Sequence, residues 1–220
     1  MSRKSAPVRF GSIKPRMPLA YPGQRIGLLG GSFNPPHAAH RLITAIARRK
    51  LGLDAVWWIV TPGNPLKSHT ELLPLDERQR MCRELAPSPK IKITTFEKDL
   101  SSTFTAATLA YIKRRHPNVH LVWLMGADNL ATFDCWQDWQ SIAEEMPLAI
   151  VDRPGWHLKS LASRAAQKLR RSYVPEQKAL LLPTMQTPAW TFLTGPLSPL
   201  SSTEIRARKF PFVTETPKPR

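Results

Sequence analysis

Short apolar runs alternate along this chain with longer stretches that have the character of helices. The strand-like runs are Arg25–Gly30, Ala55–Val60, Ile91–Thr95, Val119–Met125 and Leu148–Val151, with weaker candidates at Ala179–Leu182 and Trp190–Leu193. The helix-like stretches are His37–Lys50, Asp76–Ala86, Thr105–Arg115, Asp138–Glu145, Leu158–Arg171 and Thr203–Lys209. Continuously apolar strands are typical of a parallel sheet that is covered on both faces. The alternation predicts an α/β fold with a doubly wound parallel sheet, whose ligands bind where the strands end.

The length of 220 residues suits a single domain with a sizeable core. Both ends read as tails, because the first is basic and rich in proline and the last ten residues contain three prolines. We therefore expect a basic disordered tail over 1–23, the domain over 24–210 and a C-terminal tail over 211–220. Without an apolar segment behind it, the N-terminal tail is not a secretory signal.

Lysine and arginine number 32 against 16 acidic residues, which gives a net charge of +16. This excess favours anionic partners without choosing among phosphates, nucleotides, nucleic acids and anionic lipids. No apolar run reaches 18 residues, so we expect no membrane span. Cys82 and Cys135 form neither a CxxC nor a zinc-ligand pattern, which predicts reduced thiols in a cytoplasmic protein.

The most informative loop follows the first predicted strand and reads Gly-Gly-Ser-Phe-Asn-Pro-Pro-His-Ala-Ala-His from Gly30 to His40. Backbone N–H groups at the start of the next helix form an anion site, and two glycines would let a phosphate approach. His37 and His40 are three residues apart, so they share one face of the first helical turn. Read alone, such a loop is more often a plain turn with solvated or capping histidines, and a zinc site that lacks its other ligands is a second alternative. It is neither a dinucleotide fingerprint nor a P-loop.

A second segment, Leu200–Arg206, has the pattern of a capped helix start. Its hydroxyl residues would cap the helix, and Arg206 lies one turn inside it, suited to bidentate contact with a phosphate. A simple capped helix without a ligand is the alternative.

Together the two segments resemble the HxGH and ISSTxIR motifs of the HxGH nucleotidyltransferases, and among these the bacterial nicotinate mononucleotide adenylyltransferases. The resemblance runs from about Arg25 to Lys209, with Ala39 standing where the family usually has glycine. It implies a Rossmann-like nucleotidyltransferase fold and transfer of the adenylyl group of ATP to nicotinate mononucleotide, giving nicotinate adenine dinucleotide and pyrophosphate for NAD biosynthesis. Mg²⁺ is expected with ATP, and no metal ion is expected on protein ligands alone.

The resemblance also implies roles for particular residues. The catalytic residues are expected to be His37, His40 and Arg206. The ATP contacts are expected to be Gly30, Gly31, Ser32, Phe33, His37, His40, Asp128, Ser202, Thr203 and Arg206. The contacts to nicotinate mononucleotide are expected to be Ser32, Asn34, Lys67, Thr105 and Trp136. Three of these also have a plainer reading: Lys67 as a surface lysine, Trp136 as core, and Thr105 as an N-cap.

Several alternatives stay open from the sequence. A nicotinamide mononucleotide or dual-specific adenylyltransferase would share nearly every motif, and phosphopantetheine adenylyltransferase shares the first and last. The charge alone suggests an RNA-binding module, but no RNP motif or GXXG loop supports one. Phe104 and Gln137 replace tyrosines of relatives, Arg153 is either an adenosine contact or structural, and the oligomeric state is undetermined.

Overall fold

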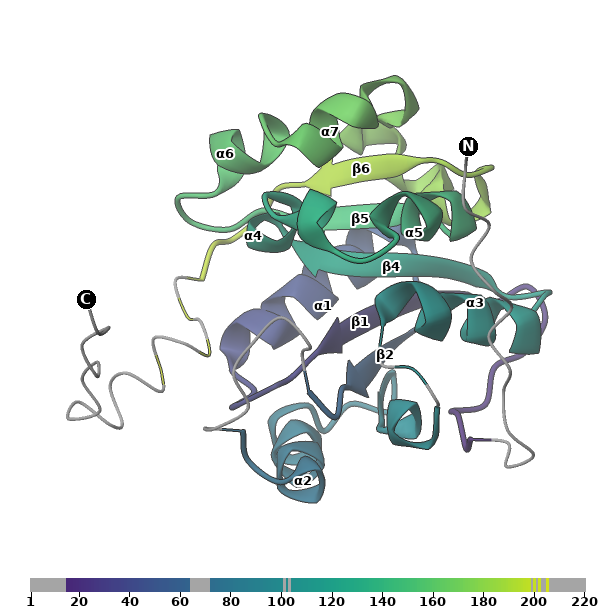
Figure 1. The fold of residues 1–220 in the computed structure, drawn as a ribbon, viewed down its shortest axis with the longest axis vertical. Helices are drawn as coiled ribbons and strands as arrows, with labels where there is room; N and C mark the ends of the chain where they lie inside the picture. The colour runs from purple at the N-terminus through teal and green to yellow at the C-terminus, as the bar shows by residue number, and fades with distance from the viewer. Residues whose placement is uncertain are drawn as a thin grey trace, which may run out of the picture.

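The computed structural model describes residues 15–63, 72–100, 102, 104–198, 200, 202 and 205. Within them, six parallel strands form one sheet in the order β3-β2-β1-β4-β5-β6 (Figure 1). Their bounds are β1 Arg25–Gly31, β2 Ala55–Val60, β3 Ile91–Thr94, β4 His120–Gly126, β5 Leu148–Val151 and β6 Trp190–Leu193. The order turns back at β1, which is the doubly wound topology that the alternating pattern predicts, and this prediction is confirmed.

Helices connect the strands. The α-helices are α1 Ala38–Leu51, α2 Leu75–Leu85, α3 Thr105–Arg115, α4 Ala127–Leu130, α5 Trp139–Glu145, α6 His157–Leu161 and α7 Arg164–Lys168. The 3₁₀ helices are η1 Phe96–Asp99, η2 Phe133–Cys135, η3 Arg170–Ser172 and η4 Glu176–Thr184. In the described part of the chain, none of these helices has the length and apolar character needed to cross a bilayer.

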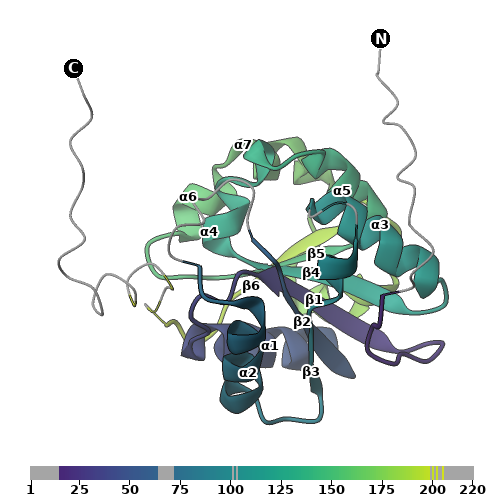
Figure 2. The ribbon, with the colours of Figure 1, turned by 60° about the horizontal axis from the view of Figure 1, so that its bottom comes forward.

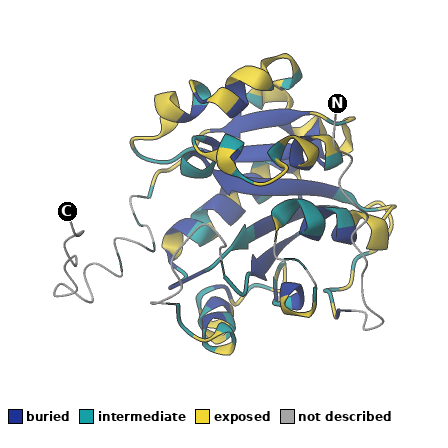
Figure 3. Ribbon diagram, in the orientation of Figure 1, coloured by how far each residue is buried: buried dark blue, intermediate teal, exposed yellow. Residues whose placement is uncertain are grey.

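The sheet separates two apolar layers, because successive side chains of a strand point to opposite faces. Trp57 of β2 belongs to the cluster that includes Leu109 of α3, whereas its neighbour Trp58 belongs to the cluster that includes Ile43 of α1. Figure 2 shows α1 and α2 on one side of the sheet and α3 and α5 on the other. The strands are buried along most of their length (Figure 3), which explains why they read as continuous apolar runs.

Two predicted elements differ in the structure. Ala179–Leu182 is part of η4 rather than a strand, because Ala179 and Leu182 are buried at a spacing of three while the two leucines between them are exposed. The long helix predicted over Leu158–Arg171 is divided into α6, α7 and η3. Ser163 breaks it, since its side chain accepts a hydrogen bond from the Ala166 N–H (3.2 Å) and starts a new helix.

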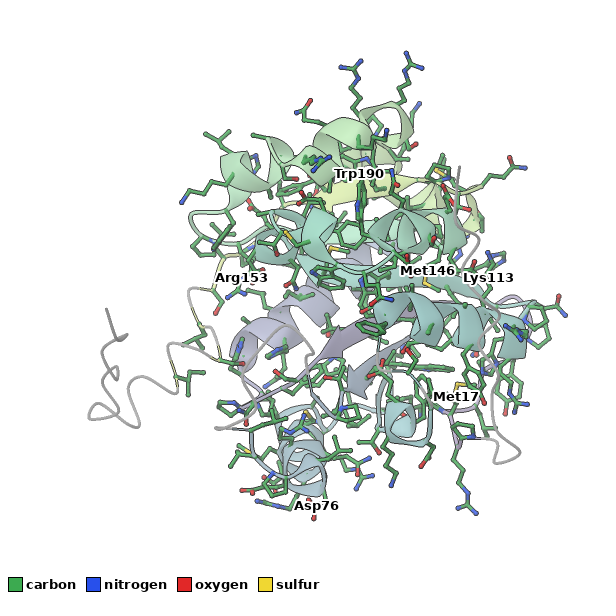
Figure 4. All side chains as sticks on the ribbon, in the orientation of Figure 1. Met17, Asp76, Lys113, Met146, Arg153 and Trp190 are labelled. Carbon is green, nitrogen blue, oxygen red and sulfur yellow. The ribbon has the colours of Figure 1, made fainter. Side chains whose placement is uncertain are left out.

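The last part of the segment expected to be an N-terminal tail contacts the domain. Pro15 is buried, Met17 and Ala20 pack against the α3 side of the core, and the N–H of Gly23 donates to the carbonyl of Asn118 (2.7 Å). Figure 4 places Met17 beside the body of the domain. Proline prevents helix formation here but does not prevent packing, so we propose that the domain includes residues 15–23. Residues 1–14 and 206–220 lie outside the described part.

Gly30 near the end of β1 is required by packing within the sheet. A Cβ built at this position would collide with the Trp123 ring of the neighbouring strand β4, whereas one at Gly31 would lie 3.5 Å from the Phe33 ring. The sequence interpretation assigned both glycines to the approach of a phosphate. At Gly30 the structure gives a different reason, because Trp123 fills the space where a side chain would stand.

We predict that Gly30→Ala lowers the free energy of unfolding by about 1–3 kcal/mol, since the large indole ring has to move from a close-packed position. Gly31→Ala is the matched control, because its methyl group meets only an ordinary van der Waals contact. Urea unfolding of the two variants measures the difference. Equal stability of both variants would contradict this account of Gly30.

Candidate active site

The turn after β1 leads directly into the N-terminus of α1. Phe33 in this turn has a left-handed backbone (φ 46°), which is unfavourable for a residue with a bulky side chain. Its ring is 1% exposed and stacks on Trp58 with 5.2 Å between the ring centroids. The packing holds the turn in this conformation, and it leaves only the backbone of Phe33 for the predicted contact with ATP.

His37 and His40 lie together at the start of α1. His37 is the N-cap residue, and the ring centroids of the two histidines are 3.9 Å apart. The first turn of α1 contains no acidic residue, while Arg48, Arg49 and Lys50 stand in its last turn. No acidic side chain therefore competes with an anion for the start of the helix, which suits the anion site that the sequence predicts.

The Nδ1 atom of His40 has two contacts with the backbone of His37. The N–H of His37 lies 3.1 Å from it and can donate to it, and the carbonyl oxygen of His37 lies 3.3 Å from it and can accept from it. Burial, with the neighbouring His37 and Arg153, lowers the pKa of His40 to about 3, although a backbone hydrogen bond to His37 opposes this. The ring is therefore neutral near pH 7. In the tautomer with the proton on Nε2, His40 both caps the helix through Nδ1 and presents an N–H donor.

Arg153 connects the end of β5 to the end of β4 and to the C-terminal segment. Its Nη1 donates to Oδ2 of Asp128 (2.8 Å), and its Nη2 donates to the carbonyl of Leu200 (2.7 Å). Figure 4 labels Arg153 at the side of the molecule where the segment after β6 leaves the sheet. The sequence left Arg153 between an adenosine contact and a structural role, and these bonds are of the structural kind.

The two motifs identified in the sequence meet in space. The hydroxyl of Ser202 donates to the carbonyl of Pro35 (3.0 Å), although 167 positions separate them in the chain. Ser202 therefore lies against the turn that carries the histidines. Thr203 and Arg206, which the sequence assigns to the same phosphate site, lie outside the described residues.

Thr105 and Trp136 lie on the opposite side of the sheet from α1. Thr105 is the first residue of α3, whose N-cap is Phe104 rather than Thr105 as the sequence suggested. Trp136 is half-buried against the α3 side of the core and meets Phe133 edge-on, with ring centroids 5.4 Å apart. Both side chains keep some exposure, which leaves them available for the predicted contact with nicotinate mononucleotide.

A buried carboxyl group holds the start of α3 in place. Glu97 of η1 is 4% exposed, and its Oε1 accepts a hydrogen bond from the Thr108 hydroxyl (2.7 Å). Burial raises the pKa of Glu97 to about 7, although the bond from Thr108 works in the opposite direction. The link fixes the start of α3 relative to η1, the element that precedes it in the chain.

Sequence reasoning missed the importance of Arg78, which lies in α2 and is 1% exposed. Its guanidinium group binds the carbonyl oxygens of Leu73, Ser32, Thr61 and Pro62 at 2.6–3.1 Å. A signal was present: Leu75, Arg78, Cys82 and Leu85 follow the i, i+3, i+7, i+10 spacing of one helix face. An arginine at the centre of that stripe indicates a buried cation whose hydrogen-bond acceptors come from other segments of the chain.

Asn34 stands beside this arginine and is 4% exposed. Its Oδ1 accepts a hydrogen bond from the N–H of Leu73 (3.1 Å), which ties the turn after β1 to the segment before α2. Lys67, the other residue predicted on the mononucleotide side, lies outside the described residues. A groove of about 1000 Å³ along the edge strand β3 contains none of the predicted site residues. No three His, Cys, Asp or Glu side chains of the described residues gather into a possible metal site.

The sequence is similar to known proteins over most of its length. The cytidylyltransferase-like family matches residues 28–208. A protein of Agrobacterium fabrum named probable nicotinate-nucleotide adenylyltransferase is 51% identical over 181 residues, which cover 82% of this chain and 97% of the relative. A protein of the same name from Methylorubrum extorquens is 52% identical over 184 residues, covering 84% of this chain and 100% of the relative.

The fold is similar to that of a solved structure. Plasmodium falciparum nicotinic acid mononucleotide adenylyltransferase, described as complexed with NaAD, superimposes with a TM-score of 0.64. The match covers 85% of this chain and 83% of that one at 22% identity. It shows that the two chains share a fold.

We predict that Glu97→Gln stabilises the protein at alkaline relative to acidic pH. The folded-state pKa of Glu97 is raised from 4.5 to about 7, so its contribution to stability is complete below pH 4.5 and is lost as the pH rises through 7. Glutamine keeps the acceptor for Thr108 and does not titrate. The stability of the variant relative to wild type should therefore increase by on the order of 3 kcal/mol between pH 4.5 and pH 8.

Urea unfolding at the two pH values measures this change. Glu84→Gln is the control, because Glu84 is an exposed glutamate paired only with Arg80 across one helical turn in the described structure. A relative stability of Glu97→Gln that stays constant between the two pH values would contradict the prediction.

Proposed function

The chain belongs to the cytidylyltransferase-like family and, within it, to the nicotinate-nucleotide adenylyltransferases; we propose that it transfers the adenylyl group of ATP to nicotinate mononucleotide. The products are nicotinate adenine dinucleotide and pyrophosphate, a step of NAD biosynthesis. The observation that carries the proposal is the contact between Ser202 and Pro35. It joins the hydroxyl-rich segment to the histidine turn, so that groups suited to phosphates converge from both ends of the chain.

The chemistry requires no general base. The nucleophile is the 5′-phosphate of the mononucleotide, whose second pKa of about 6 makes it a dianion at neutral pH. It attacks the α-phosphorus of ATP, and the bond from that phosphorus to the β-phosphate bridging oxygen breaks to release pyrophosphate. The protein has to align two polyanions that repel each other and to stabilise the charge that develops between them.

In this proposal the N-terminus of α1 holds the reacting phosphates. The N–H on Nε2 of His40 donates to a phosphate oxygen, and His37 lies beside it on the same turn. Ser202, Thr203 and Arg206 bind the β- and γ-phosphates, and Asp128 is directed to the ribose of ATP. Mg²⁺ bound to ATP would neutralise part of the phosphate charge, and it would need few ligands from the protein. The carboxylate of Asp128 is already paired with the guanidinium of Arg153 at 2.8 Å. The proposal therefore does not use Asp128 as a ligand of the metal, which is carried by the nucleotide.

In this proposal the mononucleotide lies at the same edge of the sheet as ATP, and its pyridine ring lies on the α3 side. Its pyridine ring stacks on Trp136, and its carboxylate is bound near the start of α3, where Thr105 and the helix dipole favour an anion. Lys67 neutralises part of the phosphate charge. The reaction belongs in the cytoplasm, where the buried Cys82 and the exposed Cys135 would both be reduced thiols.

We predict that His37→Ala and His40→Ala each lower kcat/KM by about 10²–10³, which is the loss expected when one preorganised donor is removed from a developing charge. His120→Ala is the matched control, because His120 begins β4 and therefore lies at the opposite edge of the sheet. Initial rates of pyrophosphate release measure the effect. Near-normal turnover in both site variants with intact circular dichroism would reject these roles.

We also predict a preference of at least about 10²-fold in kcat/KM for nicotinate over nicotinamide mononucleotide. The dipole at α3 favours the carboxylate by up to about 1 kcal/mol, and an amide would leave one polar group unpaired at a cost of about 1–3 kcal/mol. Pyrophosphate release with ATP and each mononucleotide, or with phosphopantetheine, tests the substrate. Trp136→Ala should weaken both mononucleotides alike, and loss of the Thr105 hydroxyl should affect the acid more.

Equal efficiency with the two mononucleotides would exclude an acid-specific enzyme and leave adenylyl transfer standing. Turnover with phosphopantetheine alone would overturn the proposed substrate altogether.

A further inference from the structure

The ends of β1 and β2 leave two carbonyl groups facing a gap that the backbone cannot close. The ladder between these strands ends with the bond from the Thr61 N–H to the Gly31 carbonyl (3.0 Å). Beyond it come the carbonyls of Ser32 and Thr61, and two acceptors cannot bond to each other. The Nη1 group of Arg78 donates to both of them, at 2.6 and 2.7 Å. The guanidinium therefore continues the connection between the two strands into their loops.

The remaining donors of Arg78 extend this connection to two further points. Nη2 donates to the carbonyl of Pro62 (3.1 Å), and Nε donates to the carbonyl of Leu73 (2.8 Å). Three separate segments, namely the turn after β1, the loop after β2 and the stretch before α2, are thus bound by one planar group. A guanidinium group offers five N–H donors in a fixed geometry, so it can bind acceptors in several directions at once.

Two of these segments carry residues of the mononucleotide side. The turn after β1 contains Ser32 and Asn34, and Lys67 follows the loop after β2 in the sequence, outside the described residues. The ATP side shares only the turn after β1, because its other contacts come from the ends of β4 and of the chain. A change in the spacing of the three segments would therefore affect the mononucleotide more than ATP.

Stability alone is a poor explanation for a cation at this position. Arg78 is 1% exposed, and no carboxylate among the described residues forms an ion pair with it. Burying a charge is unfavourable, and a well-packed apolar residue is often at least as stabilising. An apolar side chain, however, would leave the carbonyls of the three segments without a common donor.

We propose that Arg78 is a positioning residue for the mononucleotide: by binding carbonyl groups of three loops, it sets the spacing of the segments between which the mononucleotide phosphate lies. Arg78 itself does not touch the substrate. The inference rests on the proposed function, because it assigns the mononucleotide to these segments.

Arg78→Lys is the main test, because lysine keeps the charge but donates from a single nitrogen and cannot bind all three segments in the same directions. Steady-state kinetics of the full chain should show a KM for nicotinate mononucleotide at least about tenfold higher and a KM for ATP changed by less than about threefold, since misplacing a positioning contact affects the substrate it positions. Arg78→Gln is a second variant that retains two donors without charge. Arg80→Lys and Arg80→Gln are matched controls, because Arg80 lies on the same helix with its side chain 62% exposed.

A second measurement does not depend on activity. Hydrogen–deuterium exchange of Arg78→Lys should increase in the peptides that cover residues 30–37 and 60–63 and stay unchanged in those that cover β5 and β6, relative to Arg80→Lys. If wild type transfers no adenylyl group to nicotinate mononucleotide, the proposed function fails, and the exchange pattern still decides whether Arg78 orders these loops.

Three results would overturn the inference. The first is kinetics of both Arg78 variants that match the Arg80 controls. The second is an equal rise in both KM values or unchanged exchange in the two loops, which would deny a specific positioning role. The third is failure of both Arg78 variants to fold, which would assign Arg78 to the stability of the fold rather than to the spacing of the loops.

Discussion

Parallel strands all end at one edge of the sheet, and the carbonyl groups of the loops that follow need donors that the sheet itself does not provide. In this protein two arginines supply them. Arg78 binds four carbonyl oxygens around the ends of β1 and β2, and Arg153 binds Asp128 and the carbonyl of Leu200 around the ends of β4 and β5. Part of the large positive charge of the chain is therefore structural, and it stands where anionic substrates are to be bound.

Between the two arginines lies the start of α1, where helix formation and phosphate chemistry use the same groups. When one ring nitrogen of His40 accepts the N–H of His37, the other nitrogen carries the proton. Because burial keeps the ring neutral, it acts as a hydrogen-bond donor rather than as a cation. Such a site suits a reaction whose nucleophile is already ionised, since catalysis then depends on alignment and on donors fixed in advance.

The mononucleotide side is organised by buried links from other elements. Asn34 is bonded to Leu73, and Glu97 of η1 is bonded to Thr108 of α3. These links fix the loops and the helix start that approach the substrate, while Thr105 and Trp136 retain exposed surface. The site is thus formed by loops whose positions depend on a few buried polar side chains.

The sequence by itself determined the topology and most of the strand positions, because buried parallel strands have to be continuously apolar. It also identified both motifs at opposite ends of the chain, since glycine, histidine, hydroxyl and arginine residues at those spacings have a recognisable chemistry. The spacing of α2 indicates that Arg78 is buried, but only the tertiary structure decided what it binds, namely the carbonyl groups of Ser32, Thr61, Pro62 and Leu73. The sequence could not predict the packing of Trp123 against Gly30 or the contact of Ser202 with Pro35 either. Each joins residues far apart in the chain, and their partners are fixed only when the sheet brings the strands and their loops together.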